Sequence, residues 1–183
     1  MQQGLGWLIE RGVPVILRAE WQETSAKPCD TGSEISVVSK EFPELDWAAV
    51  DTEYPSKTGI YEWSRKGLEN RGIIAKKWLK ARDEKVIAVV SHAGFLRGAV
   101  SERRYHNADF RIFDFAEDES EDGVTLIEWE LTEKKGGGLG KSDKGRFPGW
   151  NEDKFPVGEM SKDQKAGEVV DEIPDVEIAK SER

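Results

Sequence analysis

The stretch Val86-Ile87-Ala88-Val89-Val90-Ser91-His92-Ala93-Gly94 decides the fold that this chain of 183 residues is expected to adopt. Its first five residues are apolar and mostly β-branched, which is typical of a strand buried on both faces of a parallel sheet. His92 follows the end of that predicted strand, where open α/β sheets bind their ligands. The amides of Ala93 and Gly94 are expected near a helix start, ready to receive an anion. Taken alone, His92 is equally well explained as a helix cap or as a buried polar contact.

Helices and further strands are predicted on both sides of this stretch. The helical pattern is clearest over residues 64–82, because Leu68, Gly72, Ala75 and Leu79 fall on one face. The other predicted elements are helices over residues 1–11 and 33–42, an edge strand over 13–17, and an antiparallel pair of strands over 108–115 and 124–131. Together these elements predict one α/β domain over residues 1–132.

Residues 133–183 differ in composition from the rest of the chain. A glycine cluster over residues 136–140 opens a segment that is rich in Lys, Asp, Glu, Gly and Pro. Such a segment buries too little apolar surface to offset the entropy of ordering, so a disordered tail is predicted.

Composition and charge exclude several classes of function. The formal net charge is −9, and no basic run is interleaved with aromatic residues, so nucleic acid is not expected as a partner. No apolar stretch approaches membrane-spanning length, and the first fifteen residues lack a signal-peptide pattern. The single cysteine, Cys29, excludes a disulfide within the chain. A cytoplasmic protein without a metal or cofactor is expected, and its oligomeric state is left open.

Several motifs in order resemble the histidine-phosphatase (phosphoglycerate-mutase-like) superfamily over about residues 1–132. The stretch 89–97 resembles that family's second histidine motif, and residues 21–25 with 28–33 resemble the segment of its acidic proton donor. The string Pro28-Cys29-Asp30-Thr31-Gly32-Ser33 is especially like a branch found in fungi. Further matches are Phe42-Pro43, Asp46, Ser56-Lys57-Thr58-Gly59, Trp78-Leu79 and Asn107-Ala108-Asp109-Phe110-Arg111.

The resemblance implies a three-layer α/β sandwich with a mostly parallel sheet, and a phosphoryl-transfer or phosphate-ester hydrolysis chemistry. In the intact family, a nucleophilic histidine becomes a phosphohistidine. By resemblance, His92 would stabilise the transferring oxygens and Glu23 would protonate the leaving oxygen. The amides of Ala93 and Gly94 would bind the phosphate of a small phosphorylated substrate. The resemblance favours a phosphatase over a mutase and does not name the substrate.

The family's Arg-His-Gly and Ser-Pro-Leu-Arg-Arg-Thr motifs are not found in this sequence. The domain is therefore expected to be truncated at its N-terminus, through a missing upstream coding region, through degeneration, or with completion by a partner. The other histidine, His106, matches no nucleophile motif. Whether the chain is an enzyme stays open, and the alternative is a non-catalytic pseudoenzyme that binds a phosphorylated ligand or a protein.

Four other kinds of functional site are less well supported by the sequence. Cys29 is interpreted as incidental rather than as a nucleophile, which would need a nearby base. Glu23, Asp30 and Asp46 do not have the spacing of a common metal-ligand motif. The seven tryptophans are expected in the core rather than on a carbohydrate platform. The glycine cluster lacks the flanking strand and helix of a phosphate-binding loop.

Overall fold

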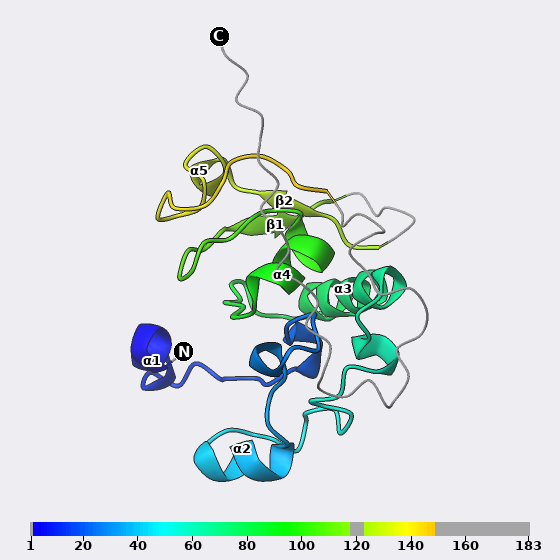
Figure 1. Cartoon of the computed structure of the whole chain (residues 1–183). Coiled ribbons are helices and arrows are strands. Elements are labelled where there is room, and N and C mark those ends of the chain that lie inside the picture. The colour runs from blue at the N-terminus through cyan, green and yellow to red at the C-terminus, as the bar shows by residue number, and fades with distance from the viewer. Residues whose placement is uncertain (1, 118–122, 149–183) are drawn as a thin grey trace.

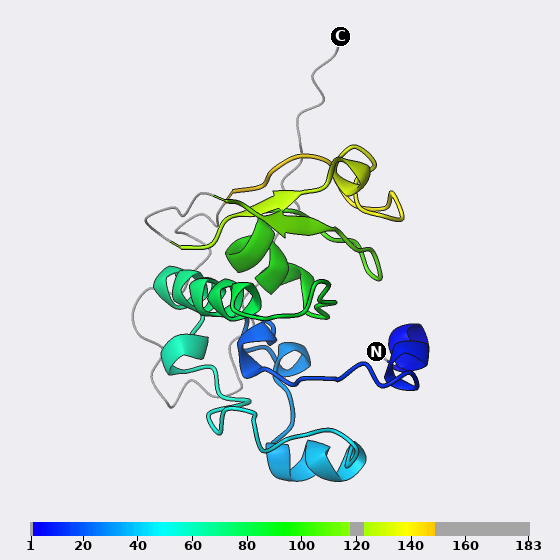
Figure 2. The ribbon, with the colours of Figure 1, turned by 180° about the vertical axis from the view of Figure 1, so that it is seen from behind.

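Helices form most of the regular structure in the computed structural model, which describes residues 2–117 and 123–148. The elements are α1 (Gln2–Ile9), the 3-10 turns η1 (Ala19–Trp21), η2 (Pro28–Asp30) and η3 (Gly59–Tyr61), α2 (Ile35–Glu41), α3 (Arg65–Lys80), α4 (Ala93–Phe95), the π-helix η4 (Leu96–Ser101), β1 (Phe113–Phe115), β2 (Leu126–Glu128) and α5 (Glu130–Glu133). Figures 1 and 2 show α4 and η4 between the long helix α3 and the small sheet.

Helix α3 confirms the clearest prediction of the sequence. Ser64 caps it, because the Ser64 hydroxyl accepts a hydrogen bond of 2.9 Å from the amide of Gly67. The face predicted to be apolar is buried as expected. Gly72 has a specific role there, since a Cβ at this position would lie 2.2 Å from the carbonyl oxygen of Ala99. The glycine thus lets α3 and η4 approach closely.

The main core lies where η1, α3 and α4 meet. Its buried members are Trp21, Trp63, Leu68, Ala75, Leu79 and Phe95. The rings of Trp21 and Phe95 meet edge to face with their centroids 5.6 Å apart, a favoured aromatic geometry. This contact joins the turn before Glu23 to the helix after His92, so the core brings the two segments of the candidate site together.

The sheet of the described residues has two antiparallel strands. β1 and β2 pair in the register Phe113 with Glu128, Asp114 with Ile127, and Phe115 with Leu126. An antiparallel pair was predicted in this region and is confirmed, although each strand has three residues instead of eight. The helices predicted over 1–11 and 33–42 also form, as α1 and α2.

Residues 86–90 do not form the buried strand that the sequence predicts. Val86 is 89% exposed and Val90 is 59% exposed. Among the described residues, no backbone–backbone hydrogen bond involves residues 83–91 or 14–17, so the predicted edge strand over 13–17 is also missing. A strand requires a neighbouring backbone, and no described segment supplies one to either run. The three-layer sandwich with a mostly parallel sheet is therefore not found in residues 2–117 and 123–148.

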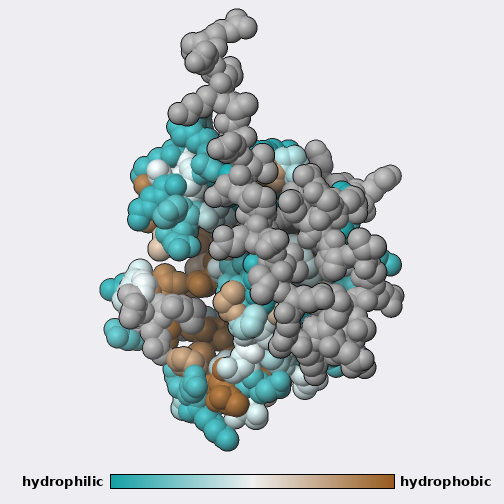
Figure 3. Space-filling view, in the orientation of Figure 1, coloured by the Kyte–Doolittle hydropathy of each residue, from teal (hydrophilic) through white to brown (hydrophobic). Residues whose placement is uncertain are grey.

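The two unpaired runs line a common apolar cleft. Residues 13–18 and 86–90, together with α1 and Trp78, enclose about 360 Å³. Figure 3 shows hydrophobic side chains gathered in a hollow beside α1, on the left of the view. Apolar residues of both predicted strands thus line this open cleft.

The described residues include the first part of the segment that the sequence assigns to a tail. Residues 133–148, assigned by sequence to a disordered tail, make specific contacts, and the remainder of that predicted tail lies outside the described residues. Asp109 accepts hydrogen bonds from the amides of Leu139 and Lys141 and from the hydroxyl of Ser142. Gly136, Gly137 and Gly140 adopt positive φ there, which lets the segment turn back onto Asp109. None of the helices described is both long and apolar enough to cross a membrane.

Candidate functional site

His92 lies in the loop that leads into α4. Its backbone is extended (φ −105°, ψ 147°), and its carbonyl oxygen accepts a hydrogen bond of 2.9 Å from the amide of Leu96. The residue is exposed, and its imidazole has no hydrogen-bond partner among the described residues. The ring is therefore free to meet a ligand from solvent. His92 precedes a helix as predicted, although the segment before it is not a paired strand.

Glu23 reaches the same loop from the other side. Its Oε1 atom accepts hydrogen bonds from the amide of Phe95, at 3.0 Å, and from that of Thr24, at 2.8 Å. Its Oε2 atom accepts a longer one, 3.3 Å, from the amide of Gly94. The predicted acid thus contacts the amide of the residue two positions after His92, although 69 positions separate Glu23 and His92 in the sequence.

The amides predicted to bind phosphate are used in two different ways. The amide of Gly94 already donates a hydrogen bond to the carboxylate of Glu23, as it would donate to an incoming anion. The amide of Ala93 has no hydrogen-bond partner outside its own helix among the described residues. Gly94 is needed for this arrangement, because a Cβ there would lie 2.6 Å from Oε1 of Glu23. Phosphate and Glu23 would therefore compete for the Gly94 amide.

Two buried cations, Lys57 and Arg71, flank Glu23. The Nζ atom of Lys57 donates a hydrogen bond of 2.7 Å to the main-chain oxygen of Glu23. Burial, and then the charge of Arg71, lower the pKa of Lys57 to about 8, while Glu23 opposes the shift. Burial likewise lowers the pKa of Arg71 to about 10, with Glu23 the main opposing charge. Both cations therefore interact electrostatically with Glu23.

The sequence analysis did not assign either cation to the site, although the position of each in the sequence is distinctive. Arg71 lies three residues after Leu68 and four before Ala75, so it falls on the apolar face of its helix. A charged residue on a buried face is unusual and marks a special environment. Lys57 belongs to the Ser56–Gly59 match, which by itself assigned it no role.

The alternative sites do not converge on His92. The amide of His106 donates to the hydroxyl of Ser142, in the layer that contains the sheet. Cys29 is exposed, and Asp30 accepts a hydrogen bond of 2.5 Å from the hydroxyl of Ser25. Asp46 accepts one from the amide of Ala48, two residues on. Over residues 2–117 and 123–148, no three metal-binding side chains gather at one point.

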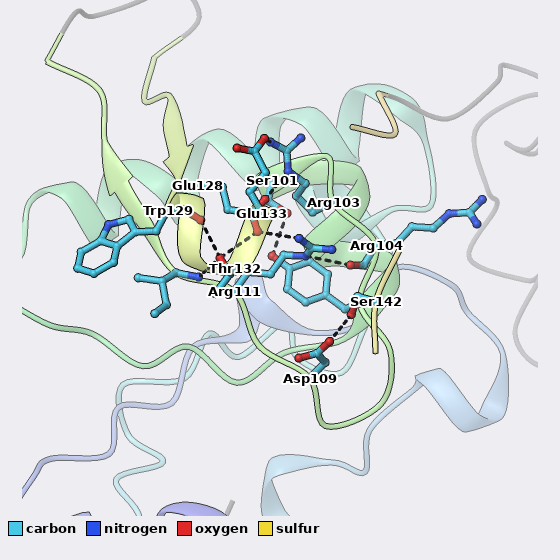
Figure 4. A network of polar contacts seen from close by, with 12 residues as sticks. Ser101, Arg103, Arg104, Asp109, Arg111, Glu128, Trp129, Thr132, Glu133 and Ser142 are labelled. Carbon is cyan, nitrogen blue, oxygen red and sulfur yellow. Dashed lines mark hydrogen bonds and ion pairs between the residues drawn. The ribbon is translucent and has the colours of Figure 1, made fainter. Parts of the chain in front are cut away.

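A second polar cluster, shown in Figure 4, ties the sheet to the loops around it. The buried carboxylate of Glu128 accepts hydrogen bonds from Arg103, at 2.5 Å, from Arg111, at 2.6 Å, and from the hydroxyl of Thr132, at 3.0 Å. Side-chain exposure is 1% for both Glu128 and Arg111. The cluster joins β2 and α5 to the segments of Arg103 and Arg111, and sequence reasoning did not find it.

Part of the chain matches curated proteins. Phosphoglycerate mutase-like protein 2 of Arabidopsis thaliana is 39% identical over 71 residues, which cover 38% of this chain and 20% of that protein. A second Arabidopsis thaliana phosphoglycerate mutase-like protein is 36% identical over 78 residues, 40% of this chain and 28% of that protein. This stretch is similar to phosphoglycerate mutase-like proteins.

The similarity supports the superfamily that the sequence motifs indicated. The matched stretch spans between a fifth and somewhat more than a quarter of the length of these relatives. No family model matches the chain, and no solved structure matches it.

Proposed function

We propose that this chain carries part of a phosphate-handling site of the histidine-phosphatase type, with His92 and Glu23 as its reactive side chains. In the intact family such a site transfers a phosphoryl group or hydrolyses a phosphate ester through a phosphohistidine. The observation that carries the proposal is the carboxylate of Glu23, held on the amides of the loop that follows the exposed His92.

The roles follow from where charge develops in phosphoryl transfer. Positive charge and N–H groups near the transferring oxygens stabilise the transition state. The imidazole of His92 and the amide of Ala93 are the groups free to do this. Glu23 is the general acid in this proposal, since its carboxyl group contacts the loop that follows His92.

The architecture and the branch of the family belong to the same proposal. The three-layer sandwich requires further strands beside residues 13–17 and 86–90, and the apolar cleft between these runs supports a place for one. The match of residues 28–33 to a fungal-type branch favours a phosphatase rather than a mutase.

A second function is favoured by one observation. His92 and His106 are the two histidines of the chain, and His106 is engaged with Ser142 in the layer of the sheet. Without a second histidine at the site, the chain would bind a phosphorylated ligand and not turn it over. We therefore expect phosphate binding with little or no hydrolysis by this polypeptide alone.

Two measurements on the full chain test these functions. Titration with inorganic phosphate, followed by NMR, should shift the signals of His92 and Ala93, and His92→Ala should weaken binding about tenfold. An aryl phosphate reports hydrolysis. Turnover that His92→Ala abolishes would make the chain an enzyme by itself and overturn the binding-only function. If phosphate does not bind to the chain at all, both functions are wrong.

A further inference from the structure

Two cations of this chain are buried without a part in the proposed chemistry. Arg71 is 1% exposed and Lys57 is 7% exposed. They come from different parts of the fold, since Arg71 lies in α3 and Lys57 in the loop before η3. Burying a cation is costly unless hydrogen bonds or opposite charges compensate it, so their common location requires an explanation.

Glu23 is the feature that the two cations share. Lys57 holds its main chain, through the hydrogen bond of 2.7 Å to its carbonyl oxygen. Arg71 acts on its side chain, because the charge of Glu23 is the largest favourable charge acting on the guanidinium. The Cζ atom of Arg71 lies 4.4 Å from the ring centroid of Phe95, whose amide donates to the carboxylate of Glu23. Lys57 thus contacts residue 23 at its backbone, and Arg71 lies against the residue whose amide binds the side chain of Glu23.

The hydrogen bonds of Arg71 alone do not explain its burial. Its Nε and Nη1 atoms have no hydrogen-bond partner among the described residues. The opposing charges are Glu23 first, followed by Tyr61 and Glu20. Lys57 adds repulsion, since Arg71 lowers its proton affinity. Glu23 is therefore the main opposite charge that offsets the burial of Arg71, and the two cations in turn attract its carboxylate.

We propose that Arg71 and Lys57 are positioning residues that hold the carboxylate of Glu23 on the amides of Gly94 and Phe95, beside His92. Their importance for catalysis rests on the proposed function, whereas the attachment itself does not. Gly94 completes the arrangement by leaving space for the carboxylate. The inference assigns a task to two residues that neither touch the proposed substrate nor belong to a motif of known role.

The attachment is tested by amide hydrogen exchange at Phe95 in the full chain. Arg71→Met keeps most of the apolar stem but removes the charge, so protection of this amide should fall about tenfold, as expected when a charge-assisted hydrogen bond is lost. Arg71→Lys restores the charge and should recover part of the protection. The matched control is Arg65→Met on the exposed start of the same helix, which should leave the Phe95 amide unchanged.

A double-mutant cycle separates positioning from simple packing. Glu23→Gln removes the charge on which Arg71 acts, so Arg71→Met should have little further effect on the Phe95 amide in that background. An equal loss of protection in both backgrounds means that Arg71 only packs, and it overturns the proposal. If Arg71→Met does not fold, Lys57→Met decides, because unchanged protection of the Phe95 amide in that variant also overturns the proposal.

These outcomes are independent of the proposed function. Loss of protection on removing either cation, together with absence of phosphate binding, would keep the attachment and reject the phosphate site. Phosphate binding that depends on His92, together with a Phe95 amide indifferent to both cations, would do the reverse.

Discussion

The hydroxyl of Ser91 donates a hydrogen bond of 2.7 Å to the main-chain oxygen of Trp21, across seventy positions of the sequence. It joins the residue before His92 to the turn that ends two residues before Glu23. Together with the contact between the rings of Trp21 and Phe95, it makes the two halves of the candidate site one unit.

Removing this hydrogen bond should loosen the site. Ser91→Ala leaves the carbonyl of Trp21 without its donor, and we expect a loss of about 1–2 kcal/mol in the free energy of unfolding. Urea denaturation followed by tryptophan fluorescence measures the loss. Ser36→Ala on the exposed side of α2 is the control, and it should change stability by less than about 0.5 kcal/mol. Equal effects of the two substitutions would contradict the importance of the Ser91 contact.

Gly94→Ala should displace the carboxylate of Glu23. The new methyl group would lie 2.6 Å from Oε1, and the flexible end of Glu23 is what can yield. We expect the amide proton signal of Phe95 to move upfield in the NMR spectrum, because its hydrogen bond to the carboxylate of Glu23 is lost. The control is Gly6→Ala inside α1, where no atom lies within 4 Å, and it should stabilise the helix by about 0.5–1 kcal/mol. A Phe95 signal that stays in place in Gly94→Ala would show that the carboxylate tolerates the methyl group.

The buried carboxylate of Glu128 should be the most sensitive position outside the site. Glu128→Gln leaves Arg111 buried without its charged partner and leaves Arg103 with Glu133 alone, so we expect about 3–5 kcal/mol of destabilisation. Thermal and chemical denaturation report the effect. Glu130→Gln removes a carboxylate from an exposed pair with Lys134 and should cost no more than about 0.5 kcal/mol. Similar stabilities of the two variants would mean that the cluster is not as cooperative as its geometry indicates.

The buried amine of Lys57 predicts a change of stability at alkaline pH. Its pKa is about 8 in the folded chain, against 10.5 for an ordinary lysine, so between these values the unfolded chain binds the additional proton. Stability contributed by this group therefore rises with pH from about 8 to about 10.5, by up to roughly 3 kcal/mol. The difference in unfolding free energy between the natural chain and Lys57→Met should show this rise. A difference that stays constant from pH 7 to 11 would contradict the prediction.

Local sequence patterns predicted α1, α2 and α3 but not α5, which begins inside the predicted strand over 124–131. The spacing of Leu68, Gly72, Ala75 and Leu79 and the cap at Ser64 specify α3 because each acts within one or two turns of the chain. The loop of His92 was also placed correctly before a helix. The run over 86–90 does not form a strand in the described residues, since apolar β-branched residues favour a strand only where another backbone is available to pair with it.

The residues of the candidate site divide in the same way. His92 and Glu23 were selected from the sequence by their motifs, and the chemistry of their side chains is a property of the residues themselves. That the Glu23 carboxylate would engage the Gly94 amide, and that Lys57 and Arg71 would be buried beside it, depended on contacts between segments far apart in the chain. Short-range propensities determine helices, whereas burial and electrostatic coupling are decided by which distant segments the fold brings together.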